Sequence, residues 1–506
     1  MRLIPLLFLV ACGPKTDDPA VDETDDETSA ADSGTLLSSL KLSEGTLEPT
    51  FSSTQRNYGV GAPVVTSTTE IIATPVDPNA VVTIEQATID GVTIASSGAS
   101  HVGLAVDQQL VITVTAADGA SSSTYFLGVQ PGNLPEMTVE TPGEADPGYY
   151  FLSNFTFGQQ PNGIGRYLLI VDGAGVPIWW RSVDGEGFDF RVQPGGDLSY
   201  IGQSPTLEHG GVVLDGSTHA VVDVWHPMTT QEGNPNDIDV HEFRLLKNGN
   251  PLILGMSPRS ADLSGEGLGQ VVVLDNILQE LDAGGSRLFE WSTEEIFDLD
   301  DLPQAFQNGI GDGFEYAHVN SIDIDPDDDN FVISARFSSE IYKVDADTGD
   351  VLWTLGGPSS DFTFVGEDRG LTFDGFAGQH SARALGDGRL LVFDNALDFD
   401  RGETGDCRYV EYALDTNAMT ATLERSYVQT GGGFCDAAGS VQRLASGHTV
   451  LGWGNLDQVN GKRAPAITEV DENDEVVFEL FLPETQWSYR AFKFDRDDTG
   501  KWIYTP

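Results

Sequence analysis

The stretch DGRLLVFD, residues 387–394, places an Asp-Gly turn directly before a run of apolar residues, a pattern typical of a short buried strand. The same unit recurs at GGDLSYIG (195–202), NGNPLILG (248–255), DDNFVISA (328–335) and SGHTVLGW (446–453). Successive units begin 53, 80, 59 and 59 residues apart. Repeats of several strands at such a period indicate a β-propeller. We therefore expect six four-stranded blades over residues 147–506, with each apolar run as the inner strand of its blade.

Residues 36–131 show a different pattern, in which apolar and polar residues alternate without a helical period. Leu110, Ile112 and Val114 fall on one face of a predicted strand, and an Asp-Gly turn at 118–119 leads to a returning strand. These features predict a small β-sandwich. Its two ends resemble the cadherin-like bacterial β-sandwich family, to which we assign no chemistry. The expected fold class is all-β, a sandwich followed by a propeller.

The first 35 residues belong to neither predicted domain. Residues 1–12 contain one basic residue and an apolar run that is too short to span a bilayer as a helix. The run ends at Cys12 in a sequence that resembles a bacterial lipobox, so we expect a lipid on Cys12; an ordinary signal peptide with a chance cysteine is the alternative. Residues 13–35 are acidic and poor in large apolar side chains, which is typical of a disordered linker. The predicted location is extracytoplasmic, with the membrane contacted through the lipid only.

Charge and cysteine content exclude several classes of function. The net charge is 26 − 79 = −53, which disfavours nucleic acid as a partner because Lys and Arg must neutralise its phosphates. Outside the cytoplasm Cys407 and Cys435 are candidates for a disulfide, with two free thiols as the alternative. No Cys/His motif suggests zinc, and we expect neither a metal nor a cofactor. The oligomeric state stays open, with a homodimer among the options.

Three histidines stand at matching positions ahead of consecutive apolar runs. His241, His318 and His380 each precede the turn of their unit by about the same distance, and Arg336 directly follows one apolar run. Equivalent positions in consecutive blades would bring these side chains to one rim of the propeller. A single histidine is more often a loop or core residue, but three at matching offsets beside an arginine favour a site.

The surrounding motifs are more specific than the histidines alone. EYAHVNSIDID (315–325), the Ser-x-Arg element ending at Arg336, GQHSARALGDGRLLVFDN (378–395) and SYRAFKF (488–494) occur in this order. Together they resemble the bacterial arylsulfate sulfotransferase family over about residues 147–506. The resemblance implies a six-bladed propeller behind a β-sandwich, located in the periplasm.

The resemblance also implies a reaction. In that family a histidine attacks the sulfur of an aryl sulfate, and a phenol then takes the sulfuryl group from the sulfohistidine without any nucleotide sulfate donor. By motif, His380 would be the nucleophile. His318, Asn320, Arg336 and His241 would hold the sulfuryl oxygens and assist proton transfer, with Asn320 as a substrate-binding residue. One position departs from the family, because Ser381 stands where an acidic residue often follows the histidine; another group must then orient His380.

Two other functions are compatible with parts of the sequence. A non-catalytic surface propeller that binds glycan or protein would suit the linker and the sandwich equally well, but it has no need of three rim histidines. A calcium site at DIDPDDDN (323–330) lacks the glycine and the closing glutamate of an EF-hand loop, so we interpret it as a solvated turn. The sequence therefore favours a sulfotransferase that acts on small aryl sulfates and phenols.

Overall fold

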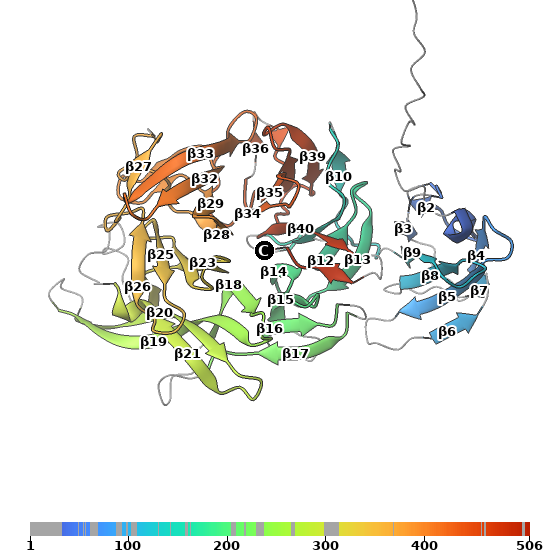
Figure 1. Ribbon diagram of the computed structural model, residues 1–506, viewed down its shortest axis with the longest axis horizontal. Coiled ribbons are helices and arrows are strands. Elements are labelled where there is room, and N and C mark those ends of the chain that lie inside the picture. The colour runs from blue at the N-terminus through green and yellow to red at the C-terminus, as the bar shows by residue number, and fades with distance from the viewer. Residues whose placement is uncertain are drawn as a thin grey trace, which may run out of the picture.

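The computed structural model describes residues 33–505 apart from gaps, the longest of which are 61–68, 88–93, 103–108, 229–236 and 298–312. Cys12 and nearly all of the predicted linker lie outside the described residues. Within these, the only helices are two single 3₁₀ turns, η1 (Ser33–Thr35) and η2 (Thr293–Glu295), and no helix is long and apolar enough to cross a membrane. The predicted all-β class, a sandwich followed by a propeller, is confirmed (Figure 1).

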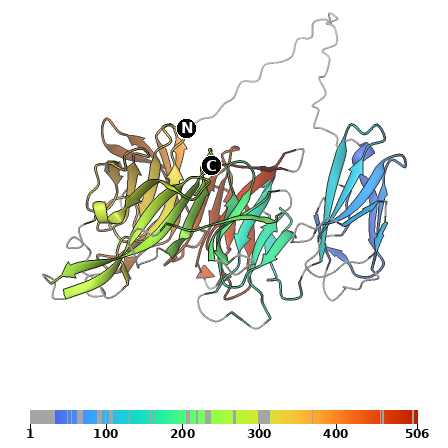
Figure 2. The same cartoon turned by 90° about the horizontal axis from the view of Figure 1, so that it is seen from below.

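The N-terminal sandwich packs two sheets around an apolar core. The sheets are β1 (Leu37–Leu42), β4 (Glu70–Pro75) and β7 (Ser100–Val102) on one side, and β2 (Leu47–Glu48), β3 (Asn57–Val60), β9 (Ser122–Val129), β8 (Gln109–Thr115), β5 (Val81–Ala87) and β6 (Ile94–Ser97) on the other. Leu110, Ile112 and Val114 of β8 all lie in the core, as their spacing predicted. Figure 2 shows the sandwich beside the propeller, where β3 and β9 contact β13.

Six sheets surround a common axis in the rest of the described chain (Figure 1). Each sheet runs from the strand nearest the axis outward. The first contains β14 (Gly187–Val192), β15 (Leu198–Gln203), β16 (His209–Leu214) and β17 (Val221–Trp225). The second contains β18 (Asp237–Leu245), β19 (Pro251–Leu263), β20 (Gly269–Leu281) and β21 (Arg287–Ser292), with β22 (Phe314–Glu315) beside β20. The third contains β23 (Val319–Ile324), β24 (Phe331–Ala335), β25 (Glu340–Val344) and β26 (Val351–Leu355). The fourth contains β28 (His380–Gly386), β29 (Arg389–Asp394), β32 (Arg408–Asp415), β33 (Thr420–Val428) and β27 (Thr363–Val365). The fifth contains β34 (Ser440–Arg443), β35 (Thr449–Gly452), β38 (Ile467–Val470), β39 (Val476–Phe481) and β10 (Thr138–Glu140). The sixth contains β40 (Ala491–Arg496), β11 (Tyr149–Ser153), β12 (Tyr167–Val171) and β13 (Pro177–Ser182), with β41 (Trp502–Ile503) paired to the end of β40. Two short hairpins lie in loops outside the six sheets. One pairs β30 (Leu397–Asp398) with β31 (Glu403–Thr404), and the other pairs β36 (Gln458–Val459) with β37 (Lys462–Arg463).

Strands from both ends of the propeller segment share one sheet. β40 pairs antiparallel with β11, so the last blade is completed by the first strands of the domain. β14, β18, β23, β28, β34 and β40 are the innermost strands, and each contacts the next around a closed ring. The sheets and the ring agree with the six blades that the sequence predicted.

The prediction that each apolar run forms the innermost strand of its blade was wrong by one strand. The runs form β15, β19, β24, β29 and β35, which are the second strands of their blades and not the innermost ones. In β29, Leu390 and Val392 pack into one apolar cluster, whereas Leu391 and Phe393 pack into another. A second strand is therefore apolar because both of its faces lie against other blades. The innermost strands line the axis, where charged side chains gather.

Candidate active site

The three predicted histidines meet at one end of the propeller axis. His241 lies in β18, His318 immediately precedes β23 and His380 is the first residue of β28. One ring nitrogen of each lies within 4.8 Å of those of the other two. The ring centroids of His241 and His318 are 4.6 Å apart in an edge-to-face arrangement. Similar positions on neighbouring inner strands thus produce the cluster that the sequence spacing predicted.

His380 is held through both of its ring nitrogens. Nδ1 lies 2.7 Å from Oδ1 of Asn395, and Nε2 accepts a hydrogen bond from the backbone N–H of Ala438 at 3.2 Å. Burial lowers the pKa of His380 well below its ordinary value, and the nearby charge of Arg336 lowers it further. The imidazole is therefore neutral at neutral pH, which is the nucleophilic form.

The other two histidines each face a carboxylate. Nδ1 of His241 lies 2.5 Å from Oδ1 of Asp239; burial opposes the charged imidazole, but Asp239 outweighs burial and raises the pKa of His241. Nδ1 of His318 lies 3.0 Å from Oε2 of Glu315, yet burial and the charge of His241 lower the pKa of His318. Neighbouring rings cannot both be charged at low cost, and of the two His241 is the ring whose surroundings favour the charged form.

Arg336 supplies a positive charge beside this cluster. Its backbone N–H donates to the carbonyl of His318 at 3.1 Å, and Nη2 donates to the carbonyl of Asp436. The guanidinium lies 5.6 Å and 5.2 Å from the ring centroids of Phe337 and Phe399. Nε has no hydrogen-bond partner among the described residues. The position predicted for Arg336 is consistent with a cation that holds sulfuryl oxygens.

Asn320 is buried and braces the loop that carries His380. Its Nδ2 donates to the carbonyl of Gln379 at 2.7 Å, and Gln379 in turn donates to the carbonyls of Ala335 and Glu340, at 3.0 Å each. Oδ1 of Asn320 is buried without a hydrogen-bond partner among the described residues. The structure thus gives Asn320 a positioning role beside the substrate contact that the sequence predicted.

A buried ion network fills the axis next to the histidines. Glu242, which follows His241, accepts hydrogen bonds from Arg191 at 2.5 Å, from Arg383 at 3.0 Å and from Arg490 at 2.6 Å. Arg490 also donates to the carbonyl of Asn320 at 2.6 Å. The network thus ties five inner-strand regions together beneath the site, those of β14, β18, β23, β28 and β40. Sequence reasoning missed it, although charged residues recur on the inner strands.

Aromatic side chains lie beside the histidines. Phe188 and Tyr489 pack edge to face with centroids 5.0 Å apart, and the Tyr489 ring lies 5.7 Å from that of His241. The cluster also includes Phe155 and Ala438. The Tyr489 hydroxyl is buried without a hydrogen-bond partner among the described residues. The cluster offers an apolar surface for an aromatic ring close to His380.

The histidine cluster also has the chemistry of a transition-metal ligand set. Three imidazoles suit zinc, and metal-binding histidines usually have the other ring nitrogen held by a carboxylate or carbonyl. Here the Nδ1 atoms lie against Asp239, Glu315 and Asn395. The positive charge of Arg336 beside the cluster works against a cation. The residues are thus able to bind a metal without requiring one.

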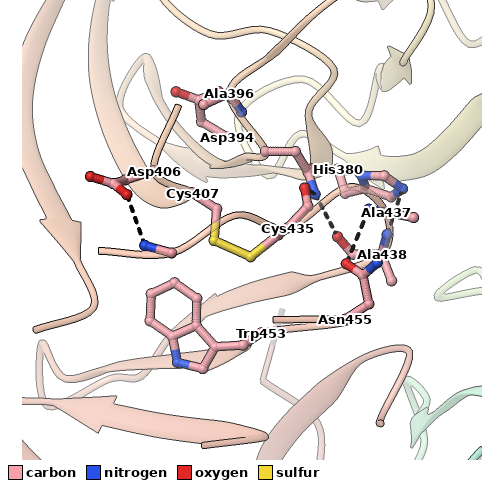
Figure 3. Close-up of a disulfide and its surroundings, with 12 residues drawn as sticks. His380, Asp394, Ala396, Asp406, Cys407, Cys435, Ala437, Ala438, Trp453 and Asn455 are labelled. Carbon is pink, nitrogen blue, oxygen red and sulfur yellow. Dashed lines mark hydrogen bonds between the residues drawn. A yellow bond between two sulfur atoms is a disulfide. The ribbon is translucent and has the colours of Figure 1, made fainter. Parts of the chain in front are cut away.

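Cys407 and Cys435 form a disulfide with Cα atoms 5.8 Å apart, which settles the pairing that the sequence left open. Figure 3 shows the disulfide beside His380 and the loop of Ala437 and Ala438. A separate cavity of about 330 Å³ lies where β14, β18 and β23 end, and its lining includes Leu245, Ile324 and Tyr504. The described residues that line this cavity include none of the three histidines.

Comparison with known proteins bears on both domains. A family model described as "Arylsulfotransferase (ASST)" matches residues 137–490, and one described as "Cadherin-like beta sandwich domain" matches residues 37–130. The chain is 24% identical over 432 residues to "Arylsulfate sulfotransferase AssT" of Escherichia coli O6:H1, covering 73% of this chain and 71% of that protein.

Solved structures give weaker matches. A protein of unknown function from Bacteroides caccae has a TM-score of 0.40 and 12% identity, over 69% of this chain and 99% of that one. An auxiliary nutrient binding protein from Bacteroides ovatus has a TM-score of 0.31 and 10% identity, over 88% of this chain and 86% of that one. Neither similarity bears on function.

Proposed function

Because this chain belongs to the arylsulfotransferase family and is an aryl-sulfate sulfotransferase, we propose that it transfers the sulfuryl group of an aryl sulfate to a phenol through a sulfohistidine at His380. The observation that carries the proposal is the geometry of His380, a neutral buried imidazole within reach of two further histidines and an arginine. A neutral imidazole has the lone pair that attack on sulfur requires.

The first half-reaction forms one bond and breaks one. Nε2 of His380 bonds to sulfur as the bond between sulfur and the aryl oxygen breaks. Protonated His241 gives its proton to the departing oxygen, so a neutral phenol leaves. Charge that spreads over the sulfuryl oxygens in the transition state is stabilised by the guanidinium of Arg336.

The second half-reaction runs the same steps backwards with a new phenol. His241 takes the proton of the acceptor hydroxyl, the phenol oxygen bonds to sulfur, and the bond between sulfur and Nε2 breaks. The lone pair returns to His380 and the proton to His241, so the site is regenerated. Because donor and acceptor are both aromatic, one surface formed by Phe188 and Tyr489 serves each ring in turn.

Independence from nucleotide donors and an extracytoplasmic location belong to the same proposal. A nucleotide sulfate donor would bring additional phosphate charge to a protein with a net charge of −53, which long-range repulsion disfavours. The Cys407–Cys435 disulfide supports an oxidising compartment. We place the protein outside the cytoplasm, anchored through a lipid on Cys12, and we leave homodimer formation to a measurement of solution mass.

The test uses the full chain with 4-nitrophenyl sulfate and a panel of phenols. We expect wild-type protein to release nitrophenol and to form the sulfated acceptor without any nucleotide. His380→Ala should abolish transfer, whereas the exposed-histidine control His209→Ala should retain it. Mass spectrometry of protein quenched with donor alone should locate the sulfuryl group on the peptide of His380. Full activity in His380→Ala, or a sulfuryl group on another residue, would overturn the proposal.

A further inference from the structure

We propose that Asn395 and the backbone of the Cys435–Ala438 loop lock His380 in its neutral Nδ1–H tautomer, so that Nε2 is the only atom able to attack sulfur. This inference rests on the proposed function in one respect, the assignment of His380 as the nucleophile. It adds a positioning residue, Asn395, and a positioning loop that replace the carboxylate absent at Ser381.

The orientation of the Asn395 amide follows from its partners. The Asn395 NH₂ group faces two backbone carbonyls, that of Cys435 at 3.1 Å and that of Ala438 at 3.0 Å. A carbonyl oxygen only accepts hydrogen bonds, so the NH₂ group must lie on this side and Oδ1 must face His380. Since Oδ1 also only accepts, the proton on the His380 ring must be at Nδ1.

The contact of the other ring nitrogen, Nε2, independently indicates the same Nδ1–H tautomer. The backbone N–H of Ala438 only donates, and it lies 3.2 Å from Nε2 of His380. Nε2 must therefore carry a lone pair. Ala438 thus orients both side chains, because its carbonyl accepts a hydrogen bond from Asn395 and its N–H donates one to the His380 ring.

The loop that makes these contacts is itself firmly held. Cys435 is bonded to Cys407 at the start of the loop, and the N–H of Ala437 donates to Oδ1 of Asn455 at 3.1 Å. Ala438 has a φ of 63°, in the left-handed region that costs a residue with a Cβ free energy. A Cβ at Gly454 would lie 2.8 Å from the carbonyl carbon of Ala438, so the glycine is needed for this close approach.

Ser381 takes no part in orienting the ring. Its hydroxyl accepts a hydrogen bond from the N–H of Val441 at 3.3 Å, which joins the innermost strands of two neighbouring blades. Ser381 is also buried, with a φ of 51°. The position beside the nucleophile is therefore structural in this protein, and Asn395, which directly follows β29, is the orienting group.

An amide has a chemical consequence that a carboxylate would not have. During attack the Nε2 lone pair forms the bond to sulfur, the bond from sulfur to the aryl oxygen breaks, and Nδ1 keeps its proton. Asn395 accepts a hydrogen bond from Nδ1–H but is far too weak a base to remove the proton. The sulfated ring therefore keeps its positive charge and remains a good leaving group. The Ala438 N–H, no longer matched by a lone pair on Nε2, becomes a donor for a sulfuryl oxygen.

The tautomer can be measured without activity. Nitrogen-15 NMR of histidine-labelled full-length protein distinguishes protonated from unprotonated ring nitrogens, and His380→Ala identifies the His380 signals. We expect wild-type His380 to show a protonated Nδ1 and an unprotonated Nε2 at neutral pH. A protonated Nε2 in the resting protein would overturn the proposal.

Two substitutions at Asn395 test the consequence for catalysis. Asn395→Ala should lower kcat about 100-fold, the scale of an acid–base or tautomer defect, with KM nearly unchanged. Asn395→Asp keeps the size of the side chain and should keep the tautomer. Its negative charge should raise the pKa of His380 against the opposing charges of Arg336, His241 and His318, which face the ring. The acidic limb of the kcat profile should therefore move to higher pH.

Gln442→Ala is the matched control, because Gln442 is a buried amide that bridges the backbone N–H and carbonyl of Lys493 away from His380. It should leave kcat and the pH profile unchanged. An unchanged kcat in Asn395→Ala, or an equal loss in Gln442→Ala, would overturn the positioning role. If wild-type protein transfers no sulfuryl group yet shows the expected tautomer, the proposed function fails while the tautomer assignment stands.

Discussion

Glu242 is the carboxylate that several arginines share in the ion network on the propeller axis. It is fully buried and contacts Arg191, Arg383 and Arg490, and it also lies 3.4 Å from Nη1 of Arg244. Burial alone would raise the pKa of Glu242, but these guanidinium groups hold it well below its ordinary value. We predict that Glu242→Gln, which keeps the shape and removes the charge, destabilises the propeller strongly.

The size of the effect follows from what remains after the change. Removing one partner of a buried ion pair costs about 3–5 kcal/mol, because the other charge is left uncompensated. Arg490 keeps Asp189 at 2.7 Å and Arg244 keeps Asp323 at 3.0 Å. Arg191 keeps only Asp189 at 3.6 Å, and Arg383 keeps the carbonyl of Ile322 at 3.1 Å but no ion pair among the described residues. Since two of the four arginines retain a close carboxylate and two do not, we expect a loss within that range.

Urea unfolding followed by tryptophan fluorescence measures this loss. All eight tryptophans lie between residues 179 and 502, so the fluorescence reports mainly on the propeller, with Trp180 packed against the sandwich at Gly128. Asp329→Asn, which breaks the exposed ion pair with Lys247, should leave the free energy of unfolding nearly unchanged. A loss below about 1 kcal/mol in Glu242→Gln, the net worth of an ordinary hydrogen bond, would refute the charge argument.

Three further predictions concern the site. Transfer needs protonated His241, and Asp239 raises the pKa of His241, so activity should fall as pH rises through that pKa. In Asp239→Asn the alkaline limb of the pH–rate profile should move to lower pH, and an unmoved limb would exclude His241 as the acid. Cys407→Ser removes the disulfide that holds the loop beside His380, so kcat for nitrophenol release should fall while KM changes less. Wild-type activity in this variant would show that the loop keeps its place without the disulfide. Zinc should inhibit transfer reversibly by binding the three imidazoles, with full activity in a chelator; weaker inhibition of His318→Ala would confirm the site, and activity that requires added metal would contradict the proposed chemistry.

Sequence patterns predicted the fold class and the meeting of His241, His318 and His380, because a repeat places equivalent positions of consecutive blades on one rim. The same patterns assigned the apolar runs to the wrong strand, since burial between blades and proximity to the axis are different properties. Asn395 is the last residue of the motif GQHSARALGDGRLLVFDN, but nothing in the motif indicates that its side chain contacts His380, fifteen positions earlier. The contact from Ala438 is made by the backbone, which leaves no trace in residue type.

The pairing of β40 with β11 has a consequence for how the protein is made. Arg490, the residue immediately before β40, supplies hydrogen bonds to Glu242 and to the carbonyl of Asn320. A growing chain in which His241, His318 and His380 have all been synthesised still lacks this arginine and the strand that closes the ring. The site is therefore assembled only after synthesis has passed β40, so incomplete chains carry the nucleophile without the framework that makes it act.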